Sequence, residues 1–170
     1  MAFFSHSYLC FMPLHHLIYE SQATQPLTEA DLLLLLQQAR AYNQANELTG
    51  LLLYASDGHF LQVLEGPMEV LHQLYFERIA HDPRHHRLQL LAAGVLERRR
   101  FSDWHMGFRF ATPEALGELT GHFNTADATF LLPLLHNLPS PLLDKLLDYV
   151  QYTAPSADLE ETRQLPSARE

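Results

Sequence analysis

The chain has one cysteine, one lysine and no long apolar run. Cys10 has no second thiol to pair with, so we expect a cytoplasmic protein that is stabilised by packing alone. The longest apolar stretches, such as Leu32 to Leu36, are far too short to cross a membrane, and the apolar start, Met1 to Met12, lacks the basic residues of a signal peptide. A single lysine within a net charge of −9 argues against binding to nucleic acid or to an anionic membrane.

The composition is that of one compact globular domain. The 170 residues are 47 % apolar and 18 % charged, which is too apolar for a disordered chain and too often interrupted by charge for a membrane protein. We therefore expect one domain with a sizeable core, to which a few helices are appended.

Apolar patterning predicts five strands and two helices in the first two thirds of the chain. Strands are expected at 14–19, 48–54, 59–64, 88–96 and 104–110, and helices at 28–42 and 67–81. Thr28, three residues before Asp31, forms a capping-box pattern, and Asp57-Gly58 is typical of a hairpin turn. This order predicts an α+β fold, a ferredoxin-like β-α-β-β-α-β-β sandwich with both helices on one face of the sheet.

The other face of that sheet needs a cover, and the C-terminal third of the chain can supply it. A helix is expected at 112–123, with Pro113 at its start, and an amphipathic stripe follows within 130–150. The stripe consists of Leu142, Leu143, Leu146, Leu147 and Val150. We expect it to pack on the bare sheet face, and a free groove for a partner is the alternative.

Gln62 is the least expected residue of the third strand. Period-two alternation puts it on the same face as Phe60 and Leu64, opposite Leu61 and Val63. A buried side-chain amide needs partners for two donors and one acceptor, or loses about 1–3 kcal/mol per missing bond. A structural glutamine with satisfied bonds and a ligand contact both agree with this position.

Each predicted helix carries a face that changes from apolar to polar along its length. These positions are Leu35, Ala39 and Asn43 on the first helix, and Tyr75, Arg78 or Ile79, and Asp82 on the second. Two such faces can hold a flat heteroaromatic ligand between them, or they can simply pack on each other. Taken alone, Asn43 is an ordinary helix cap and Tyr19 an ordinary edge aromatic.

A series of short motifs runs in order from about Leu14 to Phe110. They are Leu17-Ile18-Tyr19, Asp31 through Ala39-Arg40, Asn43, Asn46, Leu48 through Leu52, Phe60 through Gly66, Asp82-Pro83-Arg84-His85 and Trp104-His105-Met106. Together they resemble the BLUF family, the blue-light sensors that use flavin. The resemblance implies a ferredoxin-like fold that holds the isoalloxazine ring of a noncovalent flavin between its two helices.

The resemblance also implies roles for single residues. Tyr19 and Gln62 match the family's photoactive tyrosine and switching glutamine, Asn43 its flavin-anchoring asparagine, and Trp104 and Met106 its readout pair on the fifth strand. Further flavin contacts are implied for Leu35, Ala39, Tyr42, Arg78, Ile79, Asp82, Arg84 and His85. The expected cofactor is FAD, with FMN or riboflavin as alternatives, and no metal site is expected.

The implied photochemistry suits these side chains. The phenol of Tyr19 can lose an electron and a proton together, and the amide of Gln62, which both donates and accepts, can relay the proton. A flipped or tautomerised Gln62 would then donate to the flavin carbonyl at C4. Trp104 and Met106 share a parity, so we expect both to point to one sheet face and to pass the change to the segment after Thr112.

Three features depart from the family pattern. The segment from Gly66 to Ile79 is one residue longer than usual, which affects the assignment of Arg78. An extension precedes Leu14, and Met12 rather than Met1 resembles the usual start of such a domain. Tyr42 stands where a smaller polar residue or histidine is commoner, and an aromatic side chain there can stack near the flavin.

We therefore expect a sensor without enzymatic activity. Its parts are an N-terminal extension (1–13), the BLUF domain (14–110), a helical cap or output segment (111–152) and a polar, flexible tail (153–170). The residues after Phe110 are too few for a cyclase or phosphodiesterase, so the expected output is a protein partner or self-assembly into a homo-oligomer. The run Arg98 to Arg100 is expected to be a solvated turn.

Two other classes of function remain as alternatives. One is a small ferredoxin-like enzyme, such as a hydrolase that uses the adjacent pairs His15-His16 or His85-His86, although no carboxylate spacing completes a metal site. The other is a cofactor-free protein-interaction module that uses the C-terminal stripe as its interface. Yellow colour in the purified protein distinguishes the flavin sensor from both.

Overall fold

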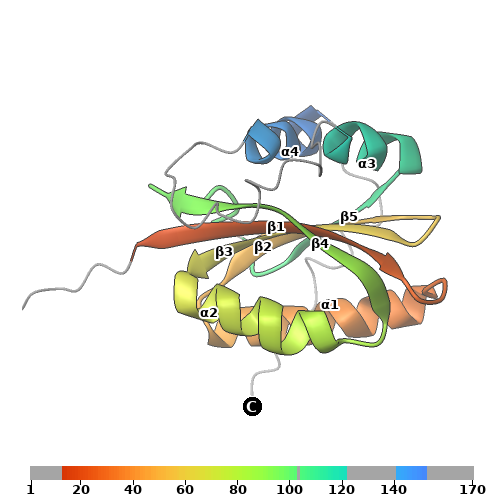
Figure 1. Ribbon diagram of the computed structural model, residues 1–170, viewed down its shortest axis with the longest axis horizontal. Helices are drawn as coiled ribbons and strands as arrows, with labels where there is room; N and C mark the ends of the chain where they lie inside the picture. The colour runs from red at the N-terminus through yellow and green to blue at the C-terminus, as the bar shows by residue number, and fades with distance from the viewer. Residues whose placement is uncertain (1–12, 103, 122–140, 153–170) are drawn as a thin grey trace, which may run out of the picture.

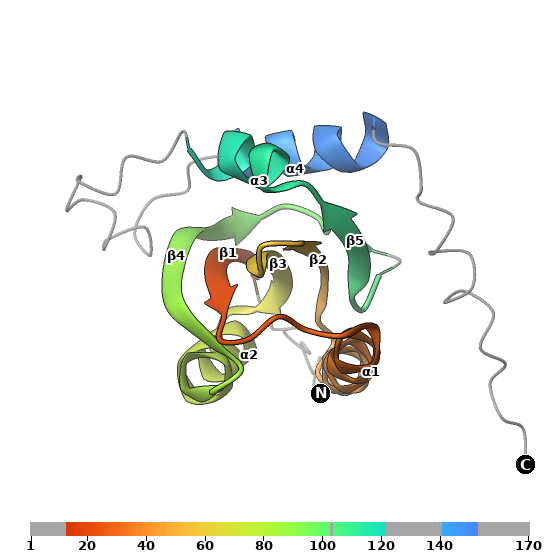
Figure 2. The ribbon, with the colours of Figure 1, turned by 90° about the vertical axis from the view of Figure 1, so that its right-hand side faces the viewer.

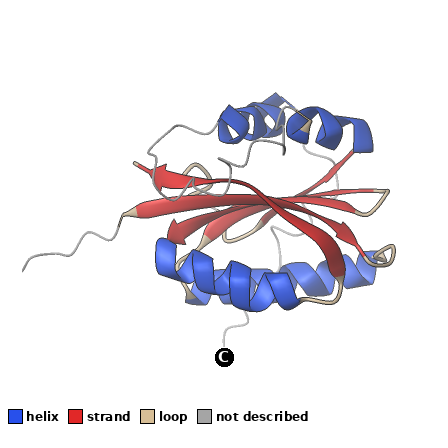
Figure 3. Ribbon diagram, viewed as in Figure 1, coloured by secondary structure: helices blue, strands red, loops and turns tan. Residues whose placement is uncertain are grey.

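A computed structural model describes residues 13–102, 104–121 and 141–152, and these form three layers (Figure 1). The middle layer is a five-stranded sheet. Helix α1 (Glu29–Ala45) and the helix that begins as α2 (Met68–His72) cover one face, and α3 (Pro113–Thr120) and α4 (Pro141–Tyr152) cover the other (Figure 3). Residues 1–12 of the predicted extension, much of the predicted C-terminal segment and the tail from Thr153 lie outside the described residues. None of the described helices is long and apolar enough to span a membrane.

The sheet has the strand order β4-β1-β3-β2-β5, seen nearly end-on in Figure 2. Its strands are β1 (Leu14–Ala23), β2 (Thr49–Ala55), β3 (His59–Pro67), β4 (His85–Leu96) and β5 (Gly107–Ala111). Neighbours are antiparallel except for β2 and β5, which are parallel. The predicted ferredoxin-like α+β fold, with C-terminal helices on the second sheet face, is confirmed.

Local sequence signals account for the start of α1 and for the β2–β3 turn. The Thr28 side chain accepts a hydrogen bond from the Asp31 amide (3.2 Å), and the Asp31 carboxylate accepts one from the Thr28 amide (2.9 Å), which completes the predicted capping box. Gly58 has a φ of 87°, a left-handed conformation that glycine adopts without steric cost, and its amide donates to the Ala55 carbonyl (2.9 Å).

The second helix changes geometry along its length. The α-helical turns of α2 are followed by a π-helical segment, η1 (Gln73–Arg78), and a 3-10 turn, η2 (Ile79–His81). A π turn closes i→i+5 hydrogen bonds and so takes up one residue more than an α turn. Such a turn can take up the one residue by which the segment from Gly66 to Ile79 is expected to exceed the family pattern.

Several predicted strand boundaries are wrong. β1 continues through the polar residues 20–22, because it lies between β3 and β4 and its backbone is paired on both sides, so Tyr19 is central rather than at an edge. β5 begins only at Gly107, so Trp104 and Met106 precede it in the connection from β4. Because these two residues are not in a strand, alternation cannot predict which way they point.

Side chains of the sheet alternate between two separate cores. Leu17, Tyr19, Phe60 and Leu64 pack against α1 and α2, whereas Ile18, Leu61 and Val63 pack against α3 and α4. The predicted parity along β3 is therefore confirmed. The C-terminal stripe belongs to the second core, where Leu142 and Leu146 are fully buried, so the stripe is core packing rather than a free groove.

The run Arg98 to Arg100 is not simply a solvated turn. Arg99 is half-buried, and its guanidinium donates to the carbonyl oxygens of Glu47 (2.6 Å) and Glu65 (2.9 Å). The prediction failed because the run was judged from its charge, whereas Arg99 satisfies backbone carbonyls at the ends of α1 and β3.

His16 is a buried histidine in the core beneath α3 and α4. It is 2 % exposed, it pairs in register with Glu65 on β3, and neither ring nitrogen has a hydrogen-bond partner of normal geometry. Burial lowers the pKa of His16 to about 4, and the backbone of Gly94 opposite it offsets part of this effect. The imidazole is therefore neutral at pH 7 in the folded protein.

We predict that His16→Leu removes much of the acid sensitivity of folding. An unfolded histidine titrates near pH 6.5, so the proton binds to the unfolded chain first as the pH falls from 6.5 towards 4. The stability contribution of His16 is fully present above pH 6.5 and should fall by about 2 kcal/mol between pH 7 and pH 5. Urea unfolding of both proteins at the two pH values measures the difference. Equal losses of stability in both proteins would contradict the prediction.

Candidate functional site

A cavity of about 230 Å³ lies between α1, the residues after α2 and the sheet. All eleven residues that the sequence predicts as cofactor contacts line it: Tyr19, Leu35, Ala39, Tyr42, Asn43, Gln62, Arg78, Ile79, Asp82, Arg84 and His85. The structure thus gathers residues from β1, α1, β3, the second helix and β4 around one space. Whether each contacts a ligand stays a prediction.

Five further lining residues were missed: Ser21, Gln38, Leu52, Phe60 and Leu74. Strand parity was the available signal for Ser21 and Phe60, which lie two residues from Tyr19 and Gln62 on the same sheet face. Gln38 lies one turn before Tyr42 on α1, and helical spacing could have identified it. Leu52 required the register of β2 against β3, which the sequence does not reveal.

Tyr19 is held deep in the wall of the cavity. It is 5 % exposed, and its ring meets that of Tyr75 edge-on, with centroids 5.4 Å apart. Its hydroxyl donates to Oε1 of Gln62, which faces it across the β1–β3 pair. Burial raises the pKa of Tyr19 far above its usual value, because a phenolate there would be poorly solvated.

The Gln62 amide has a defined orientation in this arrangement. Oε1 accepts from Tyr19, while Nε2 donates to Sδ of Met106 at 3.5 Å. Sulfur accepts hydrogen bonds weakly and cannot donate one here. A half-turn of the amide would therefore direct Oε1 at Met106 and abolish that hydrogen bond, so the contact distinguishes the two orientations.

Trp104 and Met106 point to opposite faces of the sheet, contrary to the prediction from their parity. Met106 is 3 % exposed in the core shared with Tyr19, whereas Trp104 packs against the core under α3 and α4. The ring of Trp104 stacks on Phe101 (6.0 Å, 25°) and covers Gly107, where an added Cβ would overlap it. Met106, and not Trp104, is the residue beside Gln62.

Asn43 connects the cavity to the chain segment before β5. Its Nδ2 donates to the His105 carbonyl, and Arg40, one turn away on α1, donates from Nε to the Met106 carbonyl (3.0 Å). Asn43 is 1 % exposed and also lines the cavity. The same helix face therefore borders the cavity and holds the segment that carries Met106.

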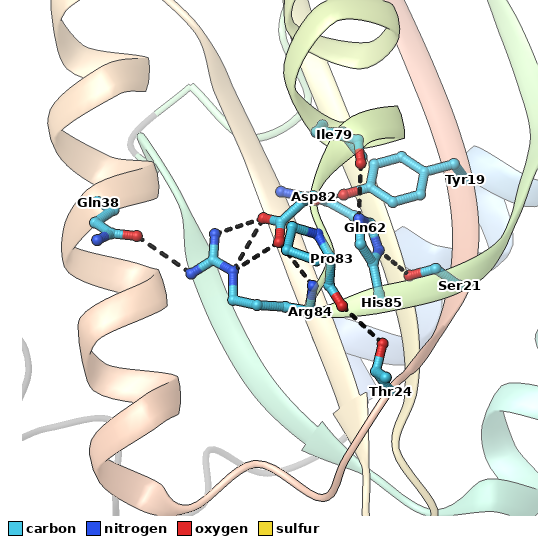
Figure 4. A network of polar contacts seen from close by, with 10 residues as sticks. All are labelled: Tyr19, Ser21, Thr24, Gln38, Gln62, Ile79, Asp82, Pro83, Arg84 and His85. Atoms are coloured by element: carbon cyan, nitrogen blue, oxygen red, sulfur yellow. Dashed lines mark hydrogen bonds and ion pairs between the residues drawn. The ribbon is translucent and has the colours of Figure 1, made fainter.

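Arg84 spans one end of the cavity (Figure 4). Its guanidinium pairs with the Asp82 carboxylate (Nη2 to Oδ2, 2.6 Å) and reaches α1 by donating to Oε1 of Gln38 (3.2 Å). Partial burial alone would raise the pKa of Asp82, but the hydrogen bonds and charge of Arg84 outweigh it and hold that pKa below its usual value. Thr24 fixes the same turn by donating to the Pro83 carbonyl (2.9 Å).

Both ring nitrogens of His85 have a hydrogen-bond partner (Figure 4). Nε2 lies 2.8 Å from the Ile79 carbonyl, which only accepts, so Nε2 carries the proton. In the neutral ring Nδ1 then accepts from the Ser21 hydroxyl at 2.8 Å. Within residues 13–102, 104–121 and 141–152, no three His, Cys, Asp or Glu side chains gather into a metal-binding cluster.

Tyr42 and Arg78 meet across the opening between the helices. The Arg78 guanidinium carbon lies 4.4 Å from the centroid of the Tyr42 ring, within the range of a cation–π contact. The π-helical segment places Arg78 at this point. Tyr42, whose identity departs from the family pattern, thus contacts a cation that also lines the cavity.

The cavity fits a planar heteroaromatic ring with carbonyl and N–H groups at its edge. Leu35 and Ala39 of α1 and Ile79 beyond η1 provide apolar walls, and the amides of Asn43 and Gln62 provide both donors and acceptors. Arg78 and Arg84 add positively charged groups to the lining. A flavin has this combination of an apolar ring system and a polar edge.

Comparison with known proteins agrees with this geometry. A family model described as BLUF, sensors of blue-light using FAD, matches residues 14–107. Photoactivated adenylate cyclase subunit beta of Euglena gracilis is 38 % identical over 89 residues, which are 52 % of this chain and 10 % of that protein. The blue light- and temperature-regulated antirepressor BluF of Escherichia coli (strain K12) is 38 % identical over 63 residues, 37 % of this chain and 15 % of that protein.

Solved structures of similar length also match. BlsA in its photo-activated state has a TM-score of 0.61 and 29 % identity, covering 84 % of this chain and 98 % of that one. The dark-state structure of BlrB, described as a BLUF protein, has a TM-score of 0.54 and 30 % identity, covering 73 % and 94 %. The curated relatives are much longer, since the match to the Euglena cyclase spans a tenth of its length.

Proposed function

Because the chain belongs to the BLUF family of blue-light photoreceptors, we propose that the hydrogen bond between Tyr19 and Gln62 is its light-operated switch. The observation that carries this proposal is the chain of contacts Tyr19–Gln62–Met106 along the wall of the cavity. The phenol of Tyr19 can be oxidised, and the amide of Gln62 can rotate. Met106, the third member, lies in the connection that leads to β5.

The proposed cofactor is a noncovalent flavin, FAD in the first place. No cysteine occurs among the described residues, so no thiol there can form an adduct. When bound, the flavin supplies absorption of blue light and an acceptor for one electron. Asn43 and Gln62 would hold its polar edge, and Leu35, Ala39 and Ile79 its ring faces.

Tyr19 is suited to give up an electron and a proton in one step. Its raised pKa keeps the phenol protonated across the physiological range, so the hydroxyl proton stays in its hydrogen bond to Oε1 of Gln62 until the electron leaves. The phenol becomes strongly acidic when it is oxidised, and Oε1 is positioned to take the proton.

After the electron and the proton have returned to Tyr19, Gln62 can settle in a second hydrogen-bond pattern. A carboxamide that gains a proton on Oε1 and loses one from Nε2 is a tautomer of the original, and rotation about its last side-chain bond also exchanges the two atoms. Rotation would direct Oε1 at Met106, and tautomerisation would leave Nε2 with one hydrogen instead of two, so either change alters the donor that the Met106 sulfur faces. The response in the site would therefore be a change of hydrogen bonding, without a covalent bond between protein and flavin.

We further propose that the helices beyond β5 carry the output. In this division, residues 14–110 are the sensor, 111–152 the output segment, and 1–13 and 153–170 the flanking segments. The protein would act without an enzymatic reaction of its own, in the cytoplasm, on a protein partner or through its own oligomeric state. Support comes from α3 and α4, which pack directly on the sheet that carries Tyr19 and Gln62.

The purified protein should be yellow, and denaturation should release all of its flavin. Absorption spectra before and after blue light should show a small reversible red shift, and chromatography of the released pigment identifies FAD, FMN or riboflavin. A colourless refolded protein that does not bind added FAD would rule out the proposal.

Tyr19→Phe and Gln62→Leu should each retain the flavin and lose the red shift. The first removes only the hydroxyl and the second only the relay, so packing is nearly conserved. Tyr54→Phe is a matched control, because Tyr54 lies in the same core and its hydroxyl instead accepts from the Leu27 amide (3.2 Å). A normal reversible shift in Tyr19→Phe or Gln62→Leu would refute the assigned role.

Met106→Ala should keep the red shift but weaken the light-dependent change at the output helices. The variant retains the Tyr19–Gln62 bond and removes the acceptor of Gln62 Nε2. Hydrogen exchange of α3 and α4 in dark and light measures the effect, and Met68→Ala, a half-buried methionine at the start of α2, is the control. An undiminished difference between dark and light in Met106→Ala would remove Met106 from the output path.

A further inference from the structure

Glu65 is a fully buried carboxylate that the proposed photochemistry does not use. It lies on β3 three residues after Gln62 and faces the opposite core, with 0 % exposure. Its oxygens accept three hydrogen bonds, from the Thr49 hydroxyl (2.9 Å), the Arg100 amide (2.8 Å) and the Phe101 amide (3.1 Å). A carboxylate isolated from water needs such donors, so this position is built for an anion.

The three bonds attach the β4–β5 connection to the sheet. Arg99 strengthens the attachment by donating to the Thr49 hydroxyl (2.9 Å) and to the carbonyl oxygens of Glu65 (2.9 Å) and Glu47 (2.6 Å). Thr49 therefore donates to the carboxylate and accepts from the guanidinium at once. The first part of the connection, residues 99–101, is therefore fixed to the ends of α1, β2 and β3.

The last part of the same connection is fixed near the cavity. Four hydrogen bonds hold residues 104–106: Gly50 N to the Trp104 carbonyl (2.9 Å), Asn43 Nδ2 to the His105 carbonyl, His105 Nδ1 to the Leu48 carbonyl (3.1 Å) and Arg40 Nε to the Met106 carbonyl (3.0 Å). Each end of the connection thus has its own anchor. Glu65 is the only carboxylate among the described residues for which a hydrogen bond to the amides of residues 100 and 101 is present.

Phe101 and Trp104 link the two parts and reach the output side. Phe101, whose amide Glu65 holds, is 4 % exposed in the core with α3 and α4, and its ring stacks on Trp104. Trp104 lies two residues before Met106, which contacts Gln62. The connection therefore has one side on the cavity and the other on the output helices.

We propose that Glu65 is a positioning residue for the light response. Its carboxylate fixes the connection so that Met106 meets Gln62 while Phe101 meets the output helices, and a change at Gln62 is passed on only while this attachment holds. The proposal rests on the proposed role of Tyr19 and Gln62. Glu65 itself does not contact the cavity, and it acts through the backbone of residues 100 and 101.

Glu65→Gln tests the charge and the acceptors with almost no change in shape. All three partners of the carboxylate are donors, and an amide can accept on only one of its two atoms, so at least one donor would face an N–H group. The connection should loosen without any change to the side chains of the cavity. Thr49→Val is the second variant, because it removes one donor and keeps the carboxylate and its backbone bonds.

Both variants should retain the flavin and the red shift, because Tyr19 and Gln62 are unchanged. The rate at which the red shift reverts in the dark should change by about threefold to tenfold in Glu65→Gln, since one hydrogen bond is weakened. The change in Thr49→Val should be smaller. The difference in hydrogen exchange of α3 and α4 between dark and light should also decrease, and it should decrease more in Glu65→Gln than in Thr49→Val. Glu20→Gln, a half-buried carboxylate on the same sheet face that pairs with His59 (3.0 Å), should change neither quantity.

Each outcome decides between the hypotheses. Wild-type recovery and a full output response in folded Glu65→Gln would overturn the positioning role, and if Glu65→Gln does not fold, the same result in Thr49→Val would overturn it. Loss of the red shift in Glu65→Gln with the flavin retained would also overturn it, because the carboxylate would then act on the photochemistry itself. Absence of a red shift in the unmodified protein would instead refute the proposed function.

Discussion

The side chains of β3 alternate between two faces that are both buried, and the rest of the molecule depends on this. Gln62 points to the cavity under α1 and α2, while its neighbours Leu61 and Val63 point to the core under α3 and α4. If only one face of β3 were covered, the strand could border the cavity or the core under α3 and α4, but not both. Because β3 lies between β1 and β2 in the sheet, its backbone is paired on both sides and directly connects the two faces.

The position of the hydrogen bond between Tyr19 and Gln62 follows from this sheet. Two residues that face each other across an antiparallel pair are within reach of a direct side-chain contact. The surrounding rings and leucines keep water away from the phenol, which raises its pKa and leaves the amide as its partner. The amide is also buried, so its orientation depends on its second neighbour, Met106.

Much of the fold could be predicted from periodicity and local signals, and so could the α1 side of the cavity, whereas Tyr19, Arg84 and His85 were predicted to line it from the resemblance to the BLUF family. The capping box of Thr28, the turn at Gly58 and the four-residue spacing of Leu35, Ala39 and Asn43 all act within a few residues. The sequence could not predict features that depend on distant pairing or irregular backbone. Trp104 and Met106 were assigned to a strand, but the fold uses them in a connection held by α1, β2 and β3, so their directions follow from those contacts. Arg99 was misjudged for the same reason, because its partners are 34 and 52 residues away.

The π-helical segment from Gln73 to Arg78 has a consequence for how such chains diverge. An added residue in a regular α-helix would rotate all that follows by about 100°, and Asp82, Arg84 and His85 would leave the cavity. One widened turn absorbs the residue locally and leaves the downstream motif in register with α1 and β1. A π-helical turn can therefore take up one residue without a change in the register of the residues that follow it. In an alignment of shorter and longer sequences, the gap belongs within this turn and not beside the Asp-Pro-Arg-His motif.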